Sequence, residues 1–469
     1  MNAIVLVADS LRRDHLHAYP GAQGWVQTPN LDRFARDAAC FEHAFAGSHP
    51  TIPNRTDIFT GRFTFPWRRW GPLPTDVPVI AEYLGKAGVV TMLIGDTYHL
   101  FKENYYFARG FAGFEWIRGQ EGDKLVTDAD IPLVYPCAKG KMRLPYPTRY
   151  DEIIRNRATR QVEEDWLAPQ VYQRAMRWLE HNHTHKNFFL WVDGFDPHEP
   201  WDPPPQYLER YSRNYAGKED CDNPPADFWA AHFTPEELQR MQARYAAEVT
   251  LVDAWLGRFL EKFEALSLAA TTLLVFATDH GVYLGYPGDG GLINKCDMTA
   301  KGALPFYRSL IHVPLLVRAP GGVRGPVPGI VQPADLGATL LDWFGVKIPA
   351  DFHGRSYLPL VRGEKQAHRE LALSCHRDAH VTVSDARWSY HVWPTDGAWK
   401  KVQQTRPAPV LFDCERDPLQ EKNLLAGGRE PAAAGGGGEA REVAARMQAR
   451  MIEELKALGA PEAFVASLR

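Results

Sequence analysis

The stretch Ala3-Ile4-Val5-Leu6-Val7-Ala8-Asp9 decides the fold class of this chain. Its apolar residues are continuous and do not alternate with polar ones, which is typical of a strand buried on both faces of a parallel sheet. In open α/β sheets, ligand-binding and catalytic groups gather after the carboxyl ends of such strands. Asp9 stands at that position, so we expect it to bind a metal ion or to take part in catalysis. The alternative is a helix N-cap, for which Asp is among the best residues.

Similar apolar runs recur along the chain with helical patterns between them, at 89–94, 188–192, 273–277 and 313–317. They predict an α/β protein built on a large, mostly parallel sheet. After about residue 350 the runs become short and alternating, which predicts a smaller antiparallel C-terminal subdomain. We expect a first domain over 1–350 and an α+β subdomain over 351–469 that ends in a closing helix.

Composition excludes several classes of function. The 469 residues are 45% hydrophobic and 23% charged, with a net charge of −4, which is too neutral for a nucleic-acid or anionic-membrane partner. No apolar run approaches the roughly 20 residues of a membrane span. The first strand follows Met1-Asn2 directly, without a signal-peptide pattern, so we expect a cytoplasmic protein. The cysteines form no CxxC pair and are expected to be mostly buried free thiols: Cys40, Cys137, Cys221, Cys296, Cys375 and Cys414.

A candidate metal pair follows the apolar run at 273–277. There the chain reads Thr278-Asp279-His280-Gly281, so a carboxylate and an imidazole can point into one crevice together with Asp9 from another strand end. Oxygen ligands with one nitrogen suit Mn²⁺, Ca²⁺, Mg²⁺ or Zn²⁺. The alternative is an Asp-His helix cap.

A candidate nucleophile lies in the stretch from Ser48 to Arg62. Thr51 is followed by Pro53, which suits the first turn of a helix, and then by Arg55. Thr51 would then lie at a helix N-terminus, where the dipole favours anions, and Arg55 could turn back towards its hydroxyl. This combination suits an anionic oxygen ester. The alternative is an N-capping threonine before an ordinary helix, with Arg55 in a surface ion pair.

Two histidines follow other strand ends. His99 comes soon after the run at 89–94 and either contacts substrate or has a structural hydrogen bond. His198 lies on a proline-rich loop after the run at 188–192, where a functional role is favoured. Residues 103–150 show no clean period, and we expect long loops there that form the rim of a substrate site.

Together, these motifs resemble the sulfatase branch of the alkaline phosphatase superfamily over nearly the whole chain. The segments that carry the resemblance are Asp9-Ser10-Leu11-Arg12-Arg13-Asp14, Thr28–Asp32, Thr51-x-Pro53-x-Arg55 to Thr60-Gly61-Arg62, Asp196-Pro197-His198-x-Pro200, Thr278–Gly281, Lys301-Gly302, and Leu411–Asp413 to Asn423-Leu424.

The resemblance implies a three-layer α/β/α sandwich with a smaller C-terminal sheet. It implies a divalent metal held by Asp9, Asp279 and His280, with the Thr51 side chain on or near it and Ser10 at a further ligand position. Arg55 would support the nucleophile. The anionic group or the leaving oxygen would be contacted by His99, His198 and Lys301.

Two residues depart from the sulfatase pattern. Sulfatases usually have Asp where this chain has Ser10, so one ligand is weakened or lost. They also carry Cys or Ser at the position of Thr51, and oxidise it to formylglycine. The same oxidation of threonine would give a ketone, so sulfate release through the aldehyde hydrate is not expected. A plain threonine alkoxide is instead what superfamily phosphodiesterases and phosphotransferases use.

We therefore predict a metal-dependent hydrolase that cleaves a phosphodiester or phosphonate monoester through Thr51. The alternatives are a sulfate ester hydrolase that works without formylglycine, and a non-catalytic binding protein on a sulfatase scaffold. The expected partner is a small anionic ester, and a homo-oligomer is possible. A second metal is left open, with candidate ligands Asp14, Asp196, His198 and His376.

Overall fold

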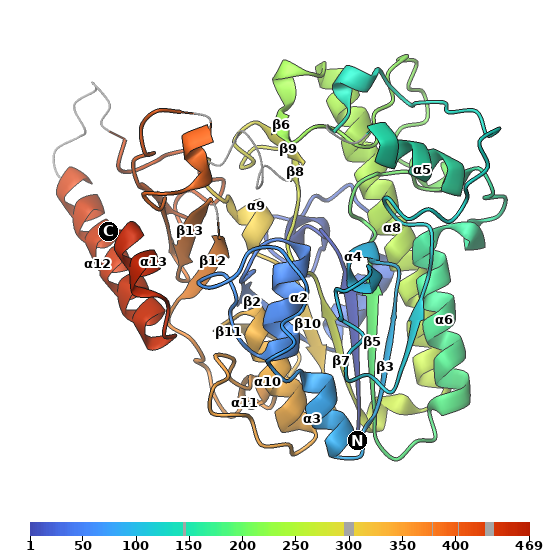
Figure 1. Cartoon of the computed structure of the whole chain (residues 1–469), viewed down its shortest axis with the longest axis horizontal. Coiled ribbons are helices and arrows are strands. Elements are labelled where there is room, and N and C mark those ends of the chain that lie inside the picture. Colours follow the sequence, from blue (N-terminus) through green and yellow to red (C-terminus); the bar gives the residue numbers. More distant parts are fainter. Residues whose placement is uncertain (144–146, 295–303, 378, 402, 427–435) are drawn as a thin grey trace.

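The computed structural model describes residues 1–143, 147–294, 304–377, 379–401, 403–426 and 436–469. Within these ranges the main sheet has eight strands in the order β11-β2-β10-β7-β1-β5-β3-β4, and helices cover both of its faces (Figure 1). Neighbouring strands pair in parallel except for β10, which is antiparallel to β2 and β7. The predicted α/β/α sandwich with a mostly parallel sheet is confirmed.

The strands of the main sheet are β1 (Asn2–Ala8), β2 (Ala39–Ala44), β3 (Val90–Gly95), β4 (Gly113–Trp116), β5 (Phe188–Gly194), β7 (Thr272–Ala277), β10 (Leu315–Arg318) and β11 (Gly325–Val331). A small three-stranded sheet contains β6 (Asp227–Phe228), β8 (Tyr283–Leu284) and β9 (Leu292–Asn294). The C-terminal sheet contains β12 (Ala372–His376), β13 (His380–Ser384), β14 (Trp388–Val392) and β15 (Val410–Asp413).

The helices are α1 (Pro29–Arg36), α2 (Thr51–Thr60), α3 (Ile80–Lys86), α4 (Tyr98–Phe101), α5 (Pro147–Arg157), α6 (Leu167–Asn182), α7 (Pro205–Leu208), α8 (Pro235–Ala265), α9 (Arg308–Ile311), α10 (Pro333–Trp343), α11 (Leu358–Val361), α12 (Gly436–Ala457) and α13 (Glu462–Ser467).

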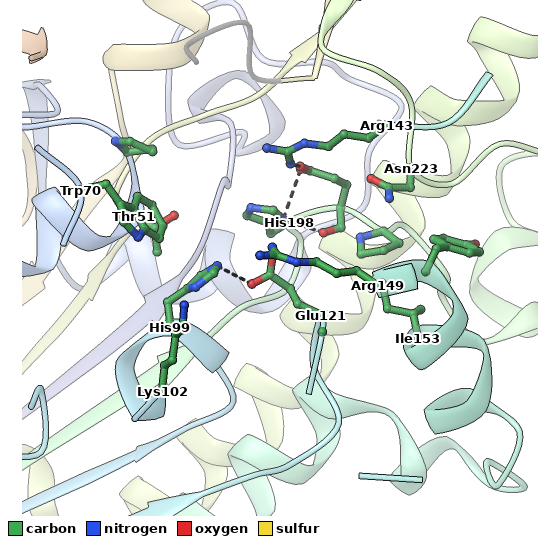
Figure 2. Close-up of a pocket in the computed structure, with 15 residues that line it drawn as sticks. Thr51, Trp70, His99, Lys102, Glu121, Arg143, Arg149, Ile153, His198 and Asn223 are labelled. Carbon is green, nitrogen blue, oxygen red and sulfur yellow. Dashed lines mark hydrogen bonds and ion pairs between the residues drawn. The ribbon is translucent and has the colours of Figure 1, made fainter. Parts of the chain in front are cut away.

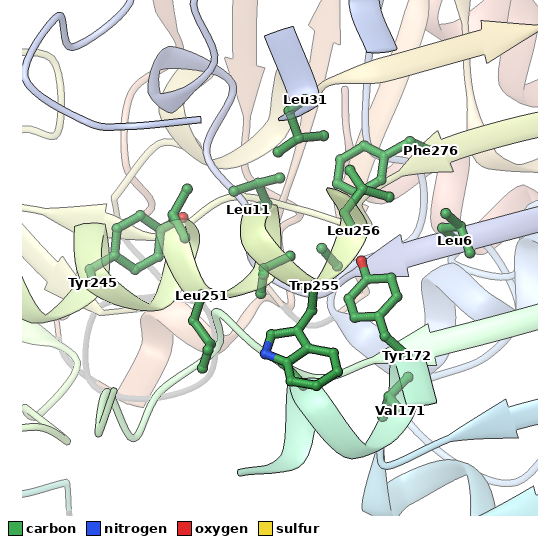
Figure 3. Packing of buried hydrophobic residues seen from close by; sticks show 14 of the residues in the cluster. Leu6, Leu11, Leu31, Val171, Tyr172, Tyr245, Leu251, Trp255, Leu256 and Phe276 are labelled. Carbon is green, nitrogen blue, oxygen red and sulfur yellow. The ribbon is translucent and has the colours of Figure 1, made fainter. Parts of the chain in front are cut away.

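Strand β1 is central and buried on both faces, as its apolar sequence predicts. Ile4, Leu6 and Ala8 face one apolar cluster, which Trp255 and other residues of α8 and α6 complete (Figure 3). The alternate residues Ala3, Val5 and Val7 face the opposite cluster, formed with α2, α3 and α10. The sheet is therefore a layer between two helical layers.

The parallel register brings strand ends together. Val7 of β1 pairs with Asp193 of β5 and with Ala277 of β7. The residues that follow these strands therefore emerge at one edge of the sheet. This alignment places Asp9 beside Asp279 although about 270 residues separate them.

The C-terminal sheet is antiparallel, in the order β12-β13-β14-β15, as predicted. Helices α12 and α13 complete its apolar cluster, which also includes Phe63 and Phe65 from the chain just after α2. The segment that follows the candidate nucleophile helix is thus packed against the C-terminal part. The division of the chain at residue 350 stays a prediction.

Some elements differ from the sequence-based expectation. The stretch 103–150, expected to be loops, contributes β4, which pairs only with β3 at the edge of the sheet. This strand is short and half exposed, so it lacks the continuous apolar run of the central strands. Cys40, Cys137, Cys221, Cys375 and Cys414 are buried free thiols as predicted, and Cys296 lies outside the described residues. Within the described ranges, no helix is both long and apolar enough to cross a bilayer.

Candidate active site

Asp9, Asp279 and His280 meet at the carboxyl edge of the sheet, as predicted. Each residue offers a ligand atom that lies within 4.8 Å of the ligand atoms of the other two. In the described part of the chain, no other group of three or more Asp, Glu, His or Cys side chains is arranged in this way. The Nε2 atom of His280 lies 3.4 Å from Asp279 Oδ2 and 4.0 Å from Asp9 Oδ1. All three side chains are buried.

The hydrogen bonds of His280 fit a metal ligand. Its Nδ1 lies 2.8 Å from the carbonyl oxygen of Gly281 and must donate to it, which leaves the lone pair on Nε2 to face the carboxylates. Gly281 is required here because a Cβ atom would lie 2.0 Å from the carbonyl oxygen of Ser309. Two carboxylates and one imidazole are a donor set that Mn²⁺, Ca²⁺, Mg²⁺ and Zn²⁺ accept.

Ser10 lies next to this group with a left-handed backbone (φ 62°). Its hydroxyl donates to Asp9 Oδ1 at 2.8 Å and lies 3.5 Å from His280 Nδ1. Its backbone N–H donates to Asp279 Oδ1 at 3.1 Å. The hydroxyl is thus on the Nδ1 edge of the imidazole, while Nε2 is the atom that faces the carboxylates. That Ser10 binds the metal stays a prediction.

Thr51 begins α2, two residues earlier than the proline-based prediction placed the helix start. Its hydroxyl oxygen lies 3.5 Å from His280 Nε2, so the hydroxyl and the three candidate ligands share one site. One turn further on, the Asn54 amide donates to the Asp279 carbonyl oxygen at 3.1 Å, which ties the helix to the end of β7. The N-terminus of α2 therefore points at the candidate metal centre.

Arg55 is fully buried among three carboxylates. Its guanidinium binds Asp193 at 3.2 Å and 3.0 Å, lies 3.2 Å from Asp9 Oδ2 and pairs closely with Asp279. Burial alone would lower the pKa of Arg55, but Asp193, Asp279 and Asp9 outweigh it and raise the pKa above its ordinary value. The charge of Arg55 is therefore permanent, and it holds the candidate ligands in place.

A further buried carboxylate, that of Asp57, holds the chain on both sides of α2. Asp57 accepts hydrogen bonds from the backbone N–H and hydroxyl of Ser48, both at 2.8 Å, and from those of Thr64 at 2.8 and 2.9 Å. A Cβ atom on Gly47 would lie 2.7 Å from Asp57 Oδ2, so the chain passes this carboxylate closely. Burial raises the pKa of Asp57 to about 7, although these hydrogen bonds act to lower it.

Thr51 opens into a cavity of about 190 Å³ that also contains His99 and His198 (Figure 2). His198 Nδ1 lies 2.6 Å from the carbonyl oxygen of Glu199, so its Nε2 is on the opposite edge of the ring. His99 Nε2 lies 2.6 Å from Glu121 Oε2. The complete lining is Pro50, Thr51, Trp70, His99, Lys102, Glu121, Gly122, Arg143, Arg149, Tyr150, Ile153, His198, Glu199, Pro200 and Asn223.

Some further predictions are either outside the described residues or not met by them. Lys301 lies outside the described residues. Asp14 is bound to Arg12 at 2.7 Å and to His15 at 2.9 Å. In the described ranges, the second-metal candidates Asp14, Asp196, His198 and His376 do not form a ligand group.

The sequence-based prediction missed several residues of the site. Asp193 follows the same strand-end pattern as Asp9 and could have been found by it. Asp57 and Asn54 lie in the quoted helix, but only their contacts give them a role. Glu121 and Arg143 come from the stretch without a period, where the sequence predicts a rim but no individual residue.

The sequence model described as Sulfatase matches residues 1–346, which is more than half of the chain. The chain belongs to the sulfatase family. A second model, described as N-sulphoglucosamine sulphohydrolase, C-terminal, matches residues 305–433. This membership confirms the resemblance drawn from the motifs and makes the protein an ester hydrolase of sulfuric or phosphoric esters.

Relatives within the family include proteins that are named for activities on different esters. An arylsulfatase of Clostridium perfringens is 26% identical, with 90% of each chain covered. The multifunctional alkaline phosphatase superfamily protein PehA of Trinickia caryophylli is 24% identical and covers 90% of this chain and 91% of its own. The phosphonate monoester hydrolase of Agrobacterium radiobacter has a similar structure, with a TM-score of 0.69, 20% identity and coverage of 96% and 95%. The sulfatase family thus fixes the class of reaction but leaves the ester open.

Proposed function

We propose that this sulfatase-family protein hydrolyses a phosphoester, either a phosphodiester or a phosphonate monoester, with Thr51 as the nucleophile. The observation that carries the proposal is the position of the Thr51 hydroxyl. It lies at the N-terminus of α2, 3.5 Å from His280 Nε2, and opens into the cavity that holds His99 and His198.

The ligand set for the cofactor is Asp9, Asp279 and His280, which together suit Mn²⁺, Ca²⁺, Zn²⁺ or Mg²⁺. When bound there, a divalent ion would lower the pKa of the Thr51 hydroxyl and offset negative charge on the transferred group. Ser10 orients the set, because it hydrogen-bonds Asp9 through its hydroxyl and Asp279 through its backbone. The expectation that it is itself a ligand is kept as the alternative.

The reaction has two displacements at phosphorus. Thr51, its proton lost to water, attacks phosphorus while the bond to the alcohol oxygen breaks, and that oxygen takes a proton from a histidine. The histidine, now neutral, accepts a proton from water as the water attacks the phosphoryl-threonine and the bond from phosphorus to the Thr51 oxygen breaks. Thr51 leaves as an alkoxide and takes a proton from solvent, which balances the proton lost in the first step and restores the hydroxyl. Arg55 and the N-terminus of α2 stabilise the developing charge, and Lys301 is proposed to do so as well.

His198 suits the role of proton donor better than His99 does. Its Nδ1 is held by Glu199, so Nε2 is the atom that can serve the leaving oxygen. His99 is engaged through Nε2 by Glu121, which favours a role in binding the anionic substrate. Both assignments agree with the two histidines lining the same cavity as Thr51.

A sulfate ester is the second candidate, favoured by the relative named as an arylsulfatase. In that case Thr51 would attack sulfur directly, or it would orient an attacking water. A non-catalytic scaffold is disfavoured because Asp9, Asp279, His280 and Arg55 remain together, whereas a decaying site would be expected to lose its ligands first. A cytoplasmic location is kept as part of the proposal.

A paired assay tests the proposal. Bis-p-nitrophenyl phosphate and p-nitrophenyl sulfate are offered to one preparation with added Mn²⁺, and Thr51→Ala is assayed beside the wild type. We expect phosphodiester turnover that falls by several orders of magnitude in the variant. Turnover of the sulfate ester alone would overturn the phosphoester assignment. Unchanged phosphodiester turnover in Thr51→Ala would overturn the role of Thr51.

A further inference from the structure

We propose that the substrate carries a second anionic group on the alcohol half of the ester, and that Arg149, Arg143 and Lys102 bind it. This inference rests on the proposed function, because it concerns the same cavity. The group is a carboxylate, sulfate or phosphate, and the three cations belong neither to the candidate metal centre nor to the nucleophile helix.

The charges in the cavity favour an anion beyond the one at the reaction centre. Three cationic side chains line it, against the two carboxylates of Glu121 and Glu199. Glu121 is paired with His99 at 2.6 Å, and Glu199 with Arg143 at 2.5 Å. Burial alone would raise the pKa of Glu121, but the neighbouring histidines and Arg143 outweigh it and lower the pKa. Both carboxylates are thus already paired with residues of the cavity.

The arginines lie where the alcohol half of the ester must go. Figure 2 shows Arg143 and Arg149 reaching towards the middle of the cavity from the side opposite Thr51. An in-line displacement places the leaving oxygen opposite the attacking one. When Thr51 attacks, the alcohol therefore points towards the two guanidinium groups.

The protein holds the Arg143 side chain in place before any substrate binds, and it anchors the helix that carries Arg149. The backbone N–H of Arg143 donates to the Asn223 carbonyl oxygen at 3.0 Å, and its side chain is fixed by Glu199. Arg149 is on α5, where the hydroxyl of the next residue, Tyr150, donates to Asp222 at 2.6 Å. The Arg143 side chain and the start of α5 next to Arg149 are thus tied to the segment that follows β5. A guanidinium held as that of Arg143 is can bind an oxyanion through two hydrogen bonds with little loss of entropy.

A matched pair of substrates tests the inference. Methyl 4-carboxyphenyl phosphate and methyl 4-carbamoylphenyl phosphate differ in one negative charge at similar size, and release of the phenol is followed by absorbance. We expect the wild type to show a KM about tenfold lower for the carboxylate. Arg149→Gln and Lys102→Gln should each bring the ratio of the two KM values close to one. Arg149→Lys keeps the positive charge but not the two parallel N–H donors of the guanidinium. This variant should keep part of the wild-type difference between the two KM values.

Arg155→Gln is the control variant, because Arg155 is also on α5 but pairs with Glu152 and does not line the cavity. It should keep the wild-type KM ratio. Equal KM values in the wild type, or an unchanged ratio in both Arg149→Gln and Lys102→Gln, would overturn the inference.

A second measurement separates this inference from the proposed function. Phosphinate analogues of the two esters, in which CH₂ replaces the ester oxygen on both sides of phosphorus, have no P–O–C bond to cleave, and their Kd values are measured by calorimetry with Mn²⁺ present. Tighter binding of the carboxylate analogue, lost in Arg149→Gln, supports the subsite even if neither ester is hydrolysed. Equal binding of the two analogues contradicts the subsite even if both esters are hydrolysed.

Discussion

Replacing Asp57 with asparagine should make the stability of the protein less dependent on pH. The ordinary pKa of this carboxyl is 3.8, and burial raises it to about 7 in the folded protein. Between these values the unfolded chain releases its proton while the folded protein keeps it. The contribution of Asp57 to wild-type stability therefore falls as pH rises, and the loss levels off above the folded pKa. Between pH 5 and pH 8 this loss is about 2.5 kcal/mol.

The variant has no such titration. Its amide turns an N–H towards the donors of Ser48 or Thr64, which costs about 1–3 kcal/mol at every pH. Asp57→Asn should therefore be less stable than the wild type at pH 5 and should lose this disadvantage by pH 8. An unfolding entropy of about 2.1 cal/mol/K per residue over 469 residues converts 2.5 kcal/mol into a change of about 2.5 °C in the difference between the two Tm values.

The assay is thermal unfolding of both proteins in one buffer series from pH 5 to pH 8. Asp76→Asn serves as the control, because the Asp76 side chain is 76% exposed and its replacement should leave the pH dependence unchanged. Linkage predicts that the difference in Tm between Asp57→Asn and the wild type changes from pH 5 to pH 8. A difference that stays constant within about 0.5 °C over this range would refute the reasoning. It would mean that the four hydrogen bonds hold Asp57 at an ordinary pKa.

Three further outcomes are expected. Asp193→Ala leaves the buried Arg55 without the carboxylate that binds it at 3.0 Å. Unfolding measurements should therefore show a free energy of unfolding lower by about 3–5 kcal/mol. A decrease below about 1 kcal/mol would contradict the structural role of this pair. Gly281→Ala drives a Cβ atom against the carbonyl oxygen of Ser309, so metal analysis should show reduced binding, whereas Gly24→Ala, with open space around it, should bind as the wild type does. Removing the metal with a chelator should lower both activity and Tm, because an ion that binds only the folded protein stabilises it. Adding Mn²⁺ back should restore both. Unchanged Tm and activity after chelation would argue against a metal cofactor.

The strand-end pattern predicted the candidate metal ligands because the pattern depends on local sequence. Asp9, Asp279 and His280 each follow a continuous apolar run, and the parallel register then brings the runs into line. Asp193 obeys the same rule. It directly follows the apolar run that ends at 192, so the sequence could have predicted it as well, although β5 itself continues to Gly194.

The wall of the cavity could not be derived in the same way. Glu121 has a left-handed backbone (φ 50°), a conformation that glutamate itself does not predict. Arg143 is placed by Glu199 and Asn223, which are distant in sequence. Tertiary contacts of this kind leave no periodic pattern, so the sequence predicts a rim without its residues.

The same difference separates the strands that the sequence predicted from those that it did not. The central strands are buried on both faces and show as unbroken apolar runs, whereas β2 carries Glu42 and His43 and β4 lies at an edge. Strands of the second kind need a partner strand to be recognised, so they were missed.

The most direct test of the central claim is the stereochemistry at phosphorus. A methyl aryl phosphate made chiral with oxygen isotopes is hydrolysed in isotopically labelled water, and the configuration of the product is determined. Each in-line displacement inverts phosphorus, so attack by Thr51 followed by attack of water predicts overall retention. Inversion would mean that water attacks directly, and would contradict the assignment of Thr51 as the nucleophile.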